Sequence, residues 1–82
     1  MKRFVINISY SWGDEEEPIN MNAADKWMVF GHMCNLAIQE LKIECNEHPE
    51  SAERTVMQVC TDKIILNYGH DDEQCYYELK EI

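Results

Sequence analysis

The chain has 82 residues, and its 16 acidic against seven basic side chains give a formal net charge of -9 at pH 7. This length has room for a single domain, residues 1–82, with one modest core, and the hydrophobic content of 45% is too high for a disordered acidic tail. The charge disfavours direct binding to nucleic acid or to an anionic membrane, and it favours a basic partner.

No apolar run approaches the ~18 residues that a membrane span needs, and the first residues do not form the apolar core of a signal peptide. The four cysteines lie within periodic segments or at their edges, at Cys34, Cys45, Cys60 and Cys75. This placement favours reduced thiols over the loop disulfides of a small secreted scaffold. We therefore expect an unexported, cytoplasmic protein.

The first predicted element is a strand, because five apolar side chains alternate with mostly polar ones and so share one face: Phe4, Ile6, Ile8, Tyr10 and Trp12. Gly13 ends this strand. The acidic run that follows predicts an exposed loop, with Asp14, Glu15, Glu16 and Glu17 before Pro18.

A long helix is predicted next, with Asn20 or Asn22 as its N-cap and its end near Cys45 or Asn46, because Pro49 disfavours helical geometry before it. Its apolar stripe recurs at steps of three and four residues, at Ala23, Trp27, Phe30, Cys34, Ala37 and Leu41, and Met33 and Leu36 widen it. Three glutamates at similar spacing share another face of this helix, Glu40, Glu44 and Glu47.

Three segments rich in branched and aromatic residues then predict strands at Arg54 to Cys60, Lys63 to Tyr68 and Gln74 to Ile82, with turns at Thr61-Asp62 and at Gly69 to Asp72. The side chains expected to face inward are Met57, Val59, Ile64, Leu66, Tyr68, Cys75, Tyr77 and Leu79. We therefore expect an α+β fold, a two-layer sandwich in which one long helix packs on a four-stranded, mainly antiparallel sheet, in the order strand, helix, strand, strand, strand.

No pattern of residues predicts catalysis or a cofactor, so we expect that the protein is not an enzyme. Cys45-x-x-His48, with Cys60, His70 and Cys75 downstream, has zinc-ligand residue types but no second close pair from a turn, so we expect ordinary thiols, solvent-facing histidines and no metal. The turn from His70 to Glu73 is too short to enclose a hard cation. A zinc-stabilised module remains a third hypothesis, for which a chelator would lower the melting temperature.

Acidic side chains concentrate in the first loop, along the end of the helix and in the last turn. Glutamates in the last helical turns oppose the helix dipole by ~0.3–1 kcal/mol each, so their placement favours a binding role over a purely solubilising one. The predicted partner-binding residues are Asp14, Glu15, Glu16, Glu17, Trp12, Glu40, Glu44, Glu47, Asp71 and Asp72. Trp12 has two interpretations, an aromatic anchor for the partner or a member of the core.

In size, acidity and strand-helix-strands plan, the chain resembles the small phage-encoded inhibitors of bacterial defence systems, which include anti-CRISPR proteins and DNA mimics. The resemblance covers the overall character of the chain and carries over no individual residue. It implies a protein of the host cytoplasm that inhibits a basic, nucleic-acid-binding protein or complex by presenting carboxylates in place of phosphates. The alternative is a self-associating structural module, a homodimer through the open sheet face or an edge strand, in which acidity serves solubility alone.

Overall fold

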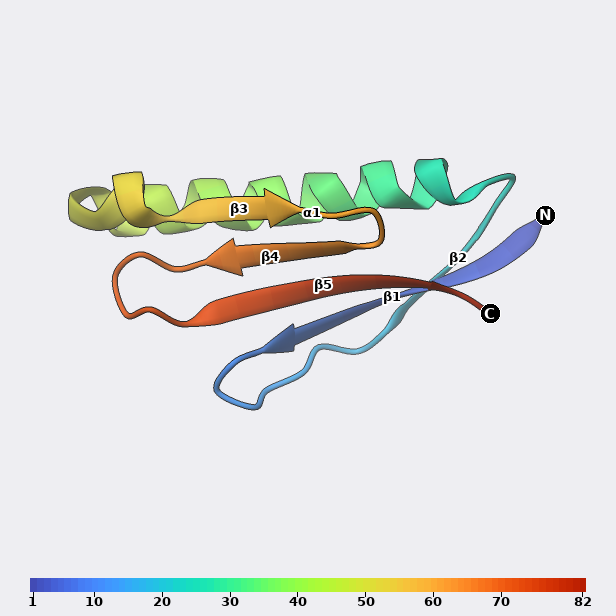
Figure 1. Cartoon of the computed structure of the whole chain (residues 1–82), viewed down its shortest axis with the longest axis horizontal. Helices are drawn as coiled ribbons and strands as arrows, with labels where there is room; N and C mark the ends of the chain where they lie inside the picture. Colours follow the sequence, from blue (N-terminus) through green and yellow to red (C-terminus); the bar gives the residue numbers. More distant parts are fainter.

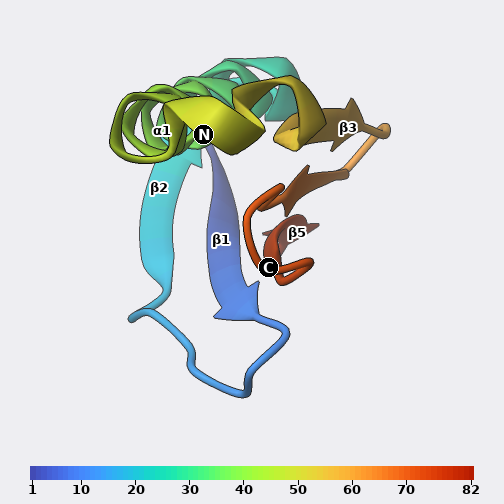
Figure 2. The ribbon, with the colours of Figure 1, turned by 90° about the vertical axis from the view of Figure 1, so that its left-hand side faces the viewer.

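The computed structural model describes every residue from Met1 to Ile82 and shows one long helix packed on one antiparallel sheet (Figure 1). The sheet has five strands, β1 (Lys2–Tyr10), β2 (Ile19–Ala23), β3 (Val56–Val59), β4 (Lys63–Asn67) and β5 (Gln74–Glu81), in the order β2-β1-β5-β4-β3. Helix α1 (Lys26–Glu47) lies between β2 and a short 3-10 helix, η1 (Pro49–Arg54). Viewed along the long axis, the sheet curves from β2 to β3 beneath the helix (Figure 2). The α+β class is confirmed.

The predicted number of four strands was wrong, because β2 is an additional strand. The segment Ile19–Ala23 pairs antiparallel with β1, from Lys2 opposite Ala23 to Ile6 opposite Ile19. Its side chains alternate between exposed asparagines and half-buried or buried apolar residues, as the period of a strand requires. Sequence analysis assigned this segment to the start of the helix, so the chain folds back once more before the helix than expected.

Helix α1 consequently begins later than predicted, and neither Asn20 nor Asn22 caps it. Asp25 is the N-cap, in extended backbone geometry, and its carboxylate accepts hydrogen bonds from the amides of Trp27 at 2.9 Å and Met28 at 3.2 Å. The helix ends at Glu47, close to the predicted end, and Pro49 opens the 3-10 helix that follows. No helix of this structure combines the length and the apolar character that crossing a membrane would take.

The buried face of α1 is rotated from the predicted stripe. Its fully buried side chains are Val29, Met33 and Ala37, whereas Trp27 is 60% exposed and lies under the ammonium of Lys26. Of the predicted stripe, Ala37 is fully buried, and three members pack against the core from its edge: Phe30, Cys34 and Leu41. Met33, which was predicted to widen the stripe, is also fully buried, so the prediction found the correct side of the helix and missed Val29.

The core lies between α1 and the inner face of the sheet. Strand β5 is central, paired with β1 on one side and β4 on the other, and its Cys75, Tyr77 and Leu79 are buried as predicted. The predicted inward residues of β4 and its end, Ile64, Leu66 and Tyr68, are also buried. Val59 was predicted to face inward but is 53% exposed, because it lies at the end of β3, an edge strand with no neighbour on its outer side.

The two ends of the sandwich differ in composition. At one end the chain termini lie together, where the amide of Ile82 donates to the carbonyl of Arg3 at 2.8 Å (Figure 1). At the other end β1 stops at Tyr10, β4 stops at Asn67, and the C-terminal half of α1 passes alongside. This second end brings together the acidic segments of the chain.

Candidate functional site: an acidic and aromatic cleft

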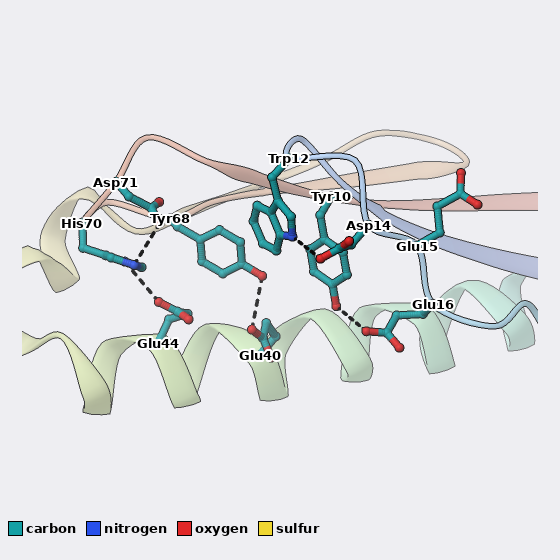
Figure 3. Close-up of a pocket in the computed structure, with 10 residues that line it drawn as sticks. All are labelled: Tyr10, Trp12, Asp14, Glu15, Glu16, Glu40, Glu44, Tyr68, His70 and Asp71. Atoms are coloured by element: carbon teal, nitrogen blue, oxygen red, sulfur yellow. Dashed lines mark hydrogen bonds and ion pairs between the residues drawn. The ribbon is translucent and has the colours of Figure 1, made fainter.

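A cleft of about 510 Å³ lies at this acidic end, between the helix and the ends of the strands (Figure 3). Three segments line it: the end of β1 with the following loop, the C-terminal half of α1, and the turn from β4 to β5. The lining residues, which we call the acidic cleft, are Tyr10, Trp12, Asp14, Glu15, Glu16, Glu40, Glu44, Tyr68, His70 and Asp71.

The aromatic residues of the acidic cleft form a continuous surface. The rings of Tyr10 and Trp12 stack with centroids 4.6 Å apart, and the centroids of Trp12 and Tyr68 are 6.0 Å apart. Each polar tip contacts one carboxylate: Tyr10 donates to Glu16 at 2.9 Å, Tyr68 to Glu40 at 3.2 Å, and Trp12 to its neighbour in the loop at 2.7 Å. These hydrogen bonds hold the carboxylates at the rim of the aromatic surface (Figure 3).

The acidic loop after β1 is exposed, as predicted, and it is also held in place by backbone hydrogen bonds. The amide of Tyr10 donates to the carbonyl of Asp14 at 2.9 Å, and the amide of Glu16 donates to Ile8 at 2.9 Å. Gly13 turns the chain with a φ of 102°, a conformation that favours glycine. The loop therefore folds back along β1 and holds its carboxylates over the end of the sheet.

The negative charge of the acidic cleft has no lysine or arginine partner within the protein. Six of its ten lining residues are acidic, and its one basic group is the imidazole of His70. Across the whole chain the ion pairs to a lysine or arginine reduce to one, between Lys80 and Glu78 on β5. The fold thus places carboxylates side by side without neutralising them internally.

Burial perturbs the groups at the back of the cleft. It raises the pKa of Tyr68 and of Tyr10, and neighbouring acidic groups raise both further, so these phenols stay neutral and donate hydrogen bonds at physiological pH. Burial also raises the pKa of Glu44, although the nearby His70 opposes this rise. The Oε2 atom of Glu44 is buried and accepts no hydrogen bond, although it lies 3.3 Å from Nδ1 of His70. A cation that approached this atom would offset the cost of its desolvation.

The structure brings most of the predicted partner-binding residues into this one cleft: Trp12, Asp14, Glu15, Glu16, Glu40, Glu44 and Asp71. Glu17 lies beside it and lines a neighbouring, more apolar groove with Ile8 and Leu36. Glu47 and Asp72 line neither. Trp12 is 48% exposed and lies beyond the end of β1, so its interpretation as a core residue was wrong.

Sequence analysis missed three lining residues: Tyr10, Tyr68 and His70. Both tyrosines were assigned to the inner face of the sheet, and each is packed against the core. Their hydroxyl groups nevertheless reach the cleft, because each tyrosine stands at the end of its strand beside an acidic segment. That position at a strand end is the signal that identifies them.

Comparisons of the chain with protein-family models, with curated protein sequences and with solved structures gave no match. We therefore infer the function from the geometry of the acidic cleft.

Proposed function

We propose that the protein binds a basic, nucleic-acid-binding protein or complex through the acidic cleft and inhibits it by occupying surface that would otherwise hold nucleic acid. The observation that carries this proposal is a cleft with six carboxylates, three aromatic side chains and no lysine or arginine. A partner that inserts its own cations supplies the counter-charge that the fold omits.

Arginine is the side chain that suits this cleft best. A guanidinium group is planar, pairs with carboxylates through two parallel hydrogen bonds, and stacks on aromatic faces. The acidic cleft offers both surfaces together, because the half-exposed ring of Trp12 contacts the carboxylate of Asp14 and the carboxylate of Glu40 lines the same cleft. The cleft's volume of about 510 Å³ lies within the range of sites that bury a small ligand or a few side chains.

Competition with nucleic acid follows from the same chemistry. Carboxylates at the end of α1 and in the loop after β1 would pair with arginine and lysine side chains of the partner. The same side chains would otherwise bind the phosphates of a nucleic acid. Such an inhibitor acts stoichiometrically, because it blocks a surface and transforms no substrate. This mode of action matches the small phage-encoded inhibitors that the chain resembles in its overall character.

The test is a capture experiment from nuclease-treated bacterial lysate, washed at low and then at high salt, followed by an assay of nucleic-acid binding by the captured protein. The cleft variant is Asp14→Asn with Glu16→Gln and Glu40→Gln, which removes three charges and retains the acceptor oxygens. The matched control removes three exposed charges outside the cleft, through Glu53→Gln, Asp62→Asn and Glu81→Gln.

We expect the wild-type protein and the control to capture a nucleic-acid-binding protein at low salt and to inhibit it, and the cleft variant to do neither. If both triple variants lost capture and inhibition equally, binding would depend on the net charge of the protein and not on the cleft, which would contradict the proposal. Recovery of no basic protein by the wild type would also refute it.

Self-association is the second candidate, and the exposed edge of the sheet favours it. Val56 and Val59 of β3 are 49% and 53% exposed, and the backbone of β3 pairs on one side only. The sheet face opposite the helix also carries apolar side chains, including Ile65 and Tyr76, without a covering layer. Light scattering separates the candidates, because a salt-insensitive dimer supports self-association and a monomer that binds a basic partner supports inhibition.

A further inference from the structure

Two histidines far apart in the sequence meet at one end of the acidic cleft. His48 caps the C-terminus of α1, and His70 stands in the turn between β4 and β5. Their rings stack with centroids 3.8 Å apart and planes inclined by 8°. Glu44, one helical turn before His48, presents its carboxylate to the same point.

We propose that Glu44, His48 and His70 bind one divalent transition-metal ion, with zinc as the ion that fits this donor set. One oxygen of Glu44 and one nitrogen of each imidazole lie within 4.8 Å of one another. Two imidazoles and a carboxylate are a known ligand combination for zinc, which leaves one coordination position for water or a ligand.

The carboxylate of Glu44 supplies an independent reason to place a cation here. Its side chain is 13% exposed, and its buried Oε2 atom accepts no hydrogen bond, although Nδ1 of His70 lies 3.3 Å from it. A buried polar atom without a partner is uncommon in a folded protein, because its desolvation is not offset. A metal ion between Glu44 and the two imidazoles would give this oxygen a bonded partner and would use the same approach of His70.

Each histidine also has an outer carboxylate of the kind that orients metal ligands. Nε2 of His70 lies 3.1 Å from Asp71, while its Nδ1 lies 3.3 Å from Glu44. Nδ1 of His48 lies 3.7 Å from Glu50. Histidines that bind a metal through one nitrogen commonly donate the other to a carboxylate, which fixes the tautomer and the ring orientation.

The separations show how the site would close on an ion. Two ligand atoms of a tetrahedral zinc ion lie about 3.3 Å apart when each bond is about 2.0–2.1 Å. The pair formed by Glu44 and His70 has this separation, 3.3 Å. His48 must tilt away from its parallel stack to bind the same ion, because nitrogens in parallel rings do not point at one ion. Its position in the cap between two helices, with a half-buried side chain, leaves room for that movement.

The ligand set differs from the cysteine-containing pattern in the sequence. Cys75 is buried in the core, Cys60 is exposed beyond β3, and the thiol of Cys45 faces the carbonyl of Ala52 at 4.0 Å. No cysteine belongs to the cluster. We expected no metal because Cys45-x-x-His48 has no second close pair of ligands from a turn, whereas the fold brings His70 from a distant turn against His48.

The test measures zinc binding to the full chain after chelator treatment, by calorimetry and by the shift of the thermal unfolding midpoint. We expect one ion per chain and a higher midpoint with zinc in the wild type. His70→Ala and Glu44→Gln should abolish both effects, and Asp71→Asn should weaken binding by about 10- to 100-fold, as loss of an outer partner does. His32→Ala is the matched control, because His32 is exposed on α1 and lies outside the cluster.

Cobalt binding provides a second readout that does not depend on stability. A nitrogen and oxygen ligand set should give visible cobalt bands without the thiolate charge-transfer band that cysteine ligands produce, and Cys60→Ser should leave the spectrum unchanged. Absence of saturable zinc binding to the wild type, or binding that His32→Ala or Cys60→Ser removes and His70→Ala does not, would overturn the proposal. Zinc and the basic partner are measured separately, so failure of one proposal leaves the other intact.

Discussion

Alanine at Gly69 should destabilise the protein, because the turn from β4 to β5 approaches the 3-10 helix too closely for a Cβ atom. A Cβ built at Gly69 would lie 2.6 Å from the carbonyl oxygen of Ser51, 2.7 Å from the carbonyl carbon of Arg54 and 2.8 Å from its Cβ. These distances fall about 0.7–0.9 Å short of about 3.5 Å, the lower end of the optimal separation for nonbonded atoms. All three atoms belong to the backbone or are fixed to it, so no side-chain rotation relieves the overlap.

The expected cost follows from overpacking, which typically destabilises by about 1–3 kcal/mol. Alanine also lowers the backbone entropy of the unfolded chain, which offsets about 0.4–1 kcal/mol of this destabilisation. The net loss of about 1–2 kcal/mol should lower the melting temperature of a domain this small by roughly 4–15 °C. Because His70 follows directly, the same substitution should also weaken zinc binding at the proposed metal site.

Gly31→Ala is the matched control. Gly31 lies inside α1, is exposed, and has no atom within 4 Å of a Cβ at its position. Alanine there should stabilise the protein by about 0.5–1 kcal/mol through its higher helix propensity. Guanidinium denaturation of both variants checks the pair, and a Gly69→Ala protein as stable as the wild type would show that the turn and the 3-10 helix do not pack as described.

Three further predictions concern stability. Asp25→Ala should cost about 1 kcal/mol in urea denaturation, because it removes the N-cap of α1, and a loss under a few tenths would contradict that role. Thr55→Val should cost about 1–3 kcal/mol, because the buried hydroxyl of Thr55 accepts a hydrogen bond from the amide of Gly69 at 3.0 Å and this partly buried amide would lose its partner. Burial raises the pKa of Tyr68 and Tyr77 above the unfolded value of about 10, so their contribution to stability is present below pH 10 and is lost as pH rises above it. Each of the two tyrosines should lower the free energy of unfolding by about 1.4 kcal/mol per pH unit above pH 10. Tyr77→Phe should therefore reduce the slope of this free energy against pH, as measured by denaturation followed by circular dichroism, and an unchanged slope would refute this account.

The sequence predicted the fold class and most of the core because periodicity reports burial directly. It did not predict β2, although Ile19, Met21 and Ala23 alternate with asparagines. Asparagine is favoured at helix caps, and methionine and alanine are favoured in helices, so local preference outweighed a short alternation. The segment is a strand because β1 lies alongside to pair with it. That pairing depends on an acidic loop that folds back, which no local pattern reports.

The acidic cleft was predictable in parts and not as a whole. The spacing of Glu40 and Glu44 on one helix face follows from the helical period. Their meeting with Tyr68, which lies 28 residues after Glu40, depends on how the sandwich closes. The same holds for His48 and His70, because a stack between a helix cap and a distant turn leaves no trace in residue spacing. Long-range juxtaposition is thus the part of the site that required the structure.

The position of the chain ends determines how the protein can be attached and joined. Ile82 pairs with Arg3 at the end of the sandwich opposite the acidic cleft. A tag or a surface linkage at either terminus therefore leaves the cleft facing the solution. The same proximity allows a short peptide to close the backbone into a circle without displacing β1 or β5. Closure would lower the entropy of the unfolded state and yield a more heat-resistant form with an unchanged cleft.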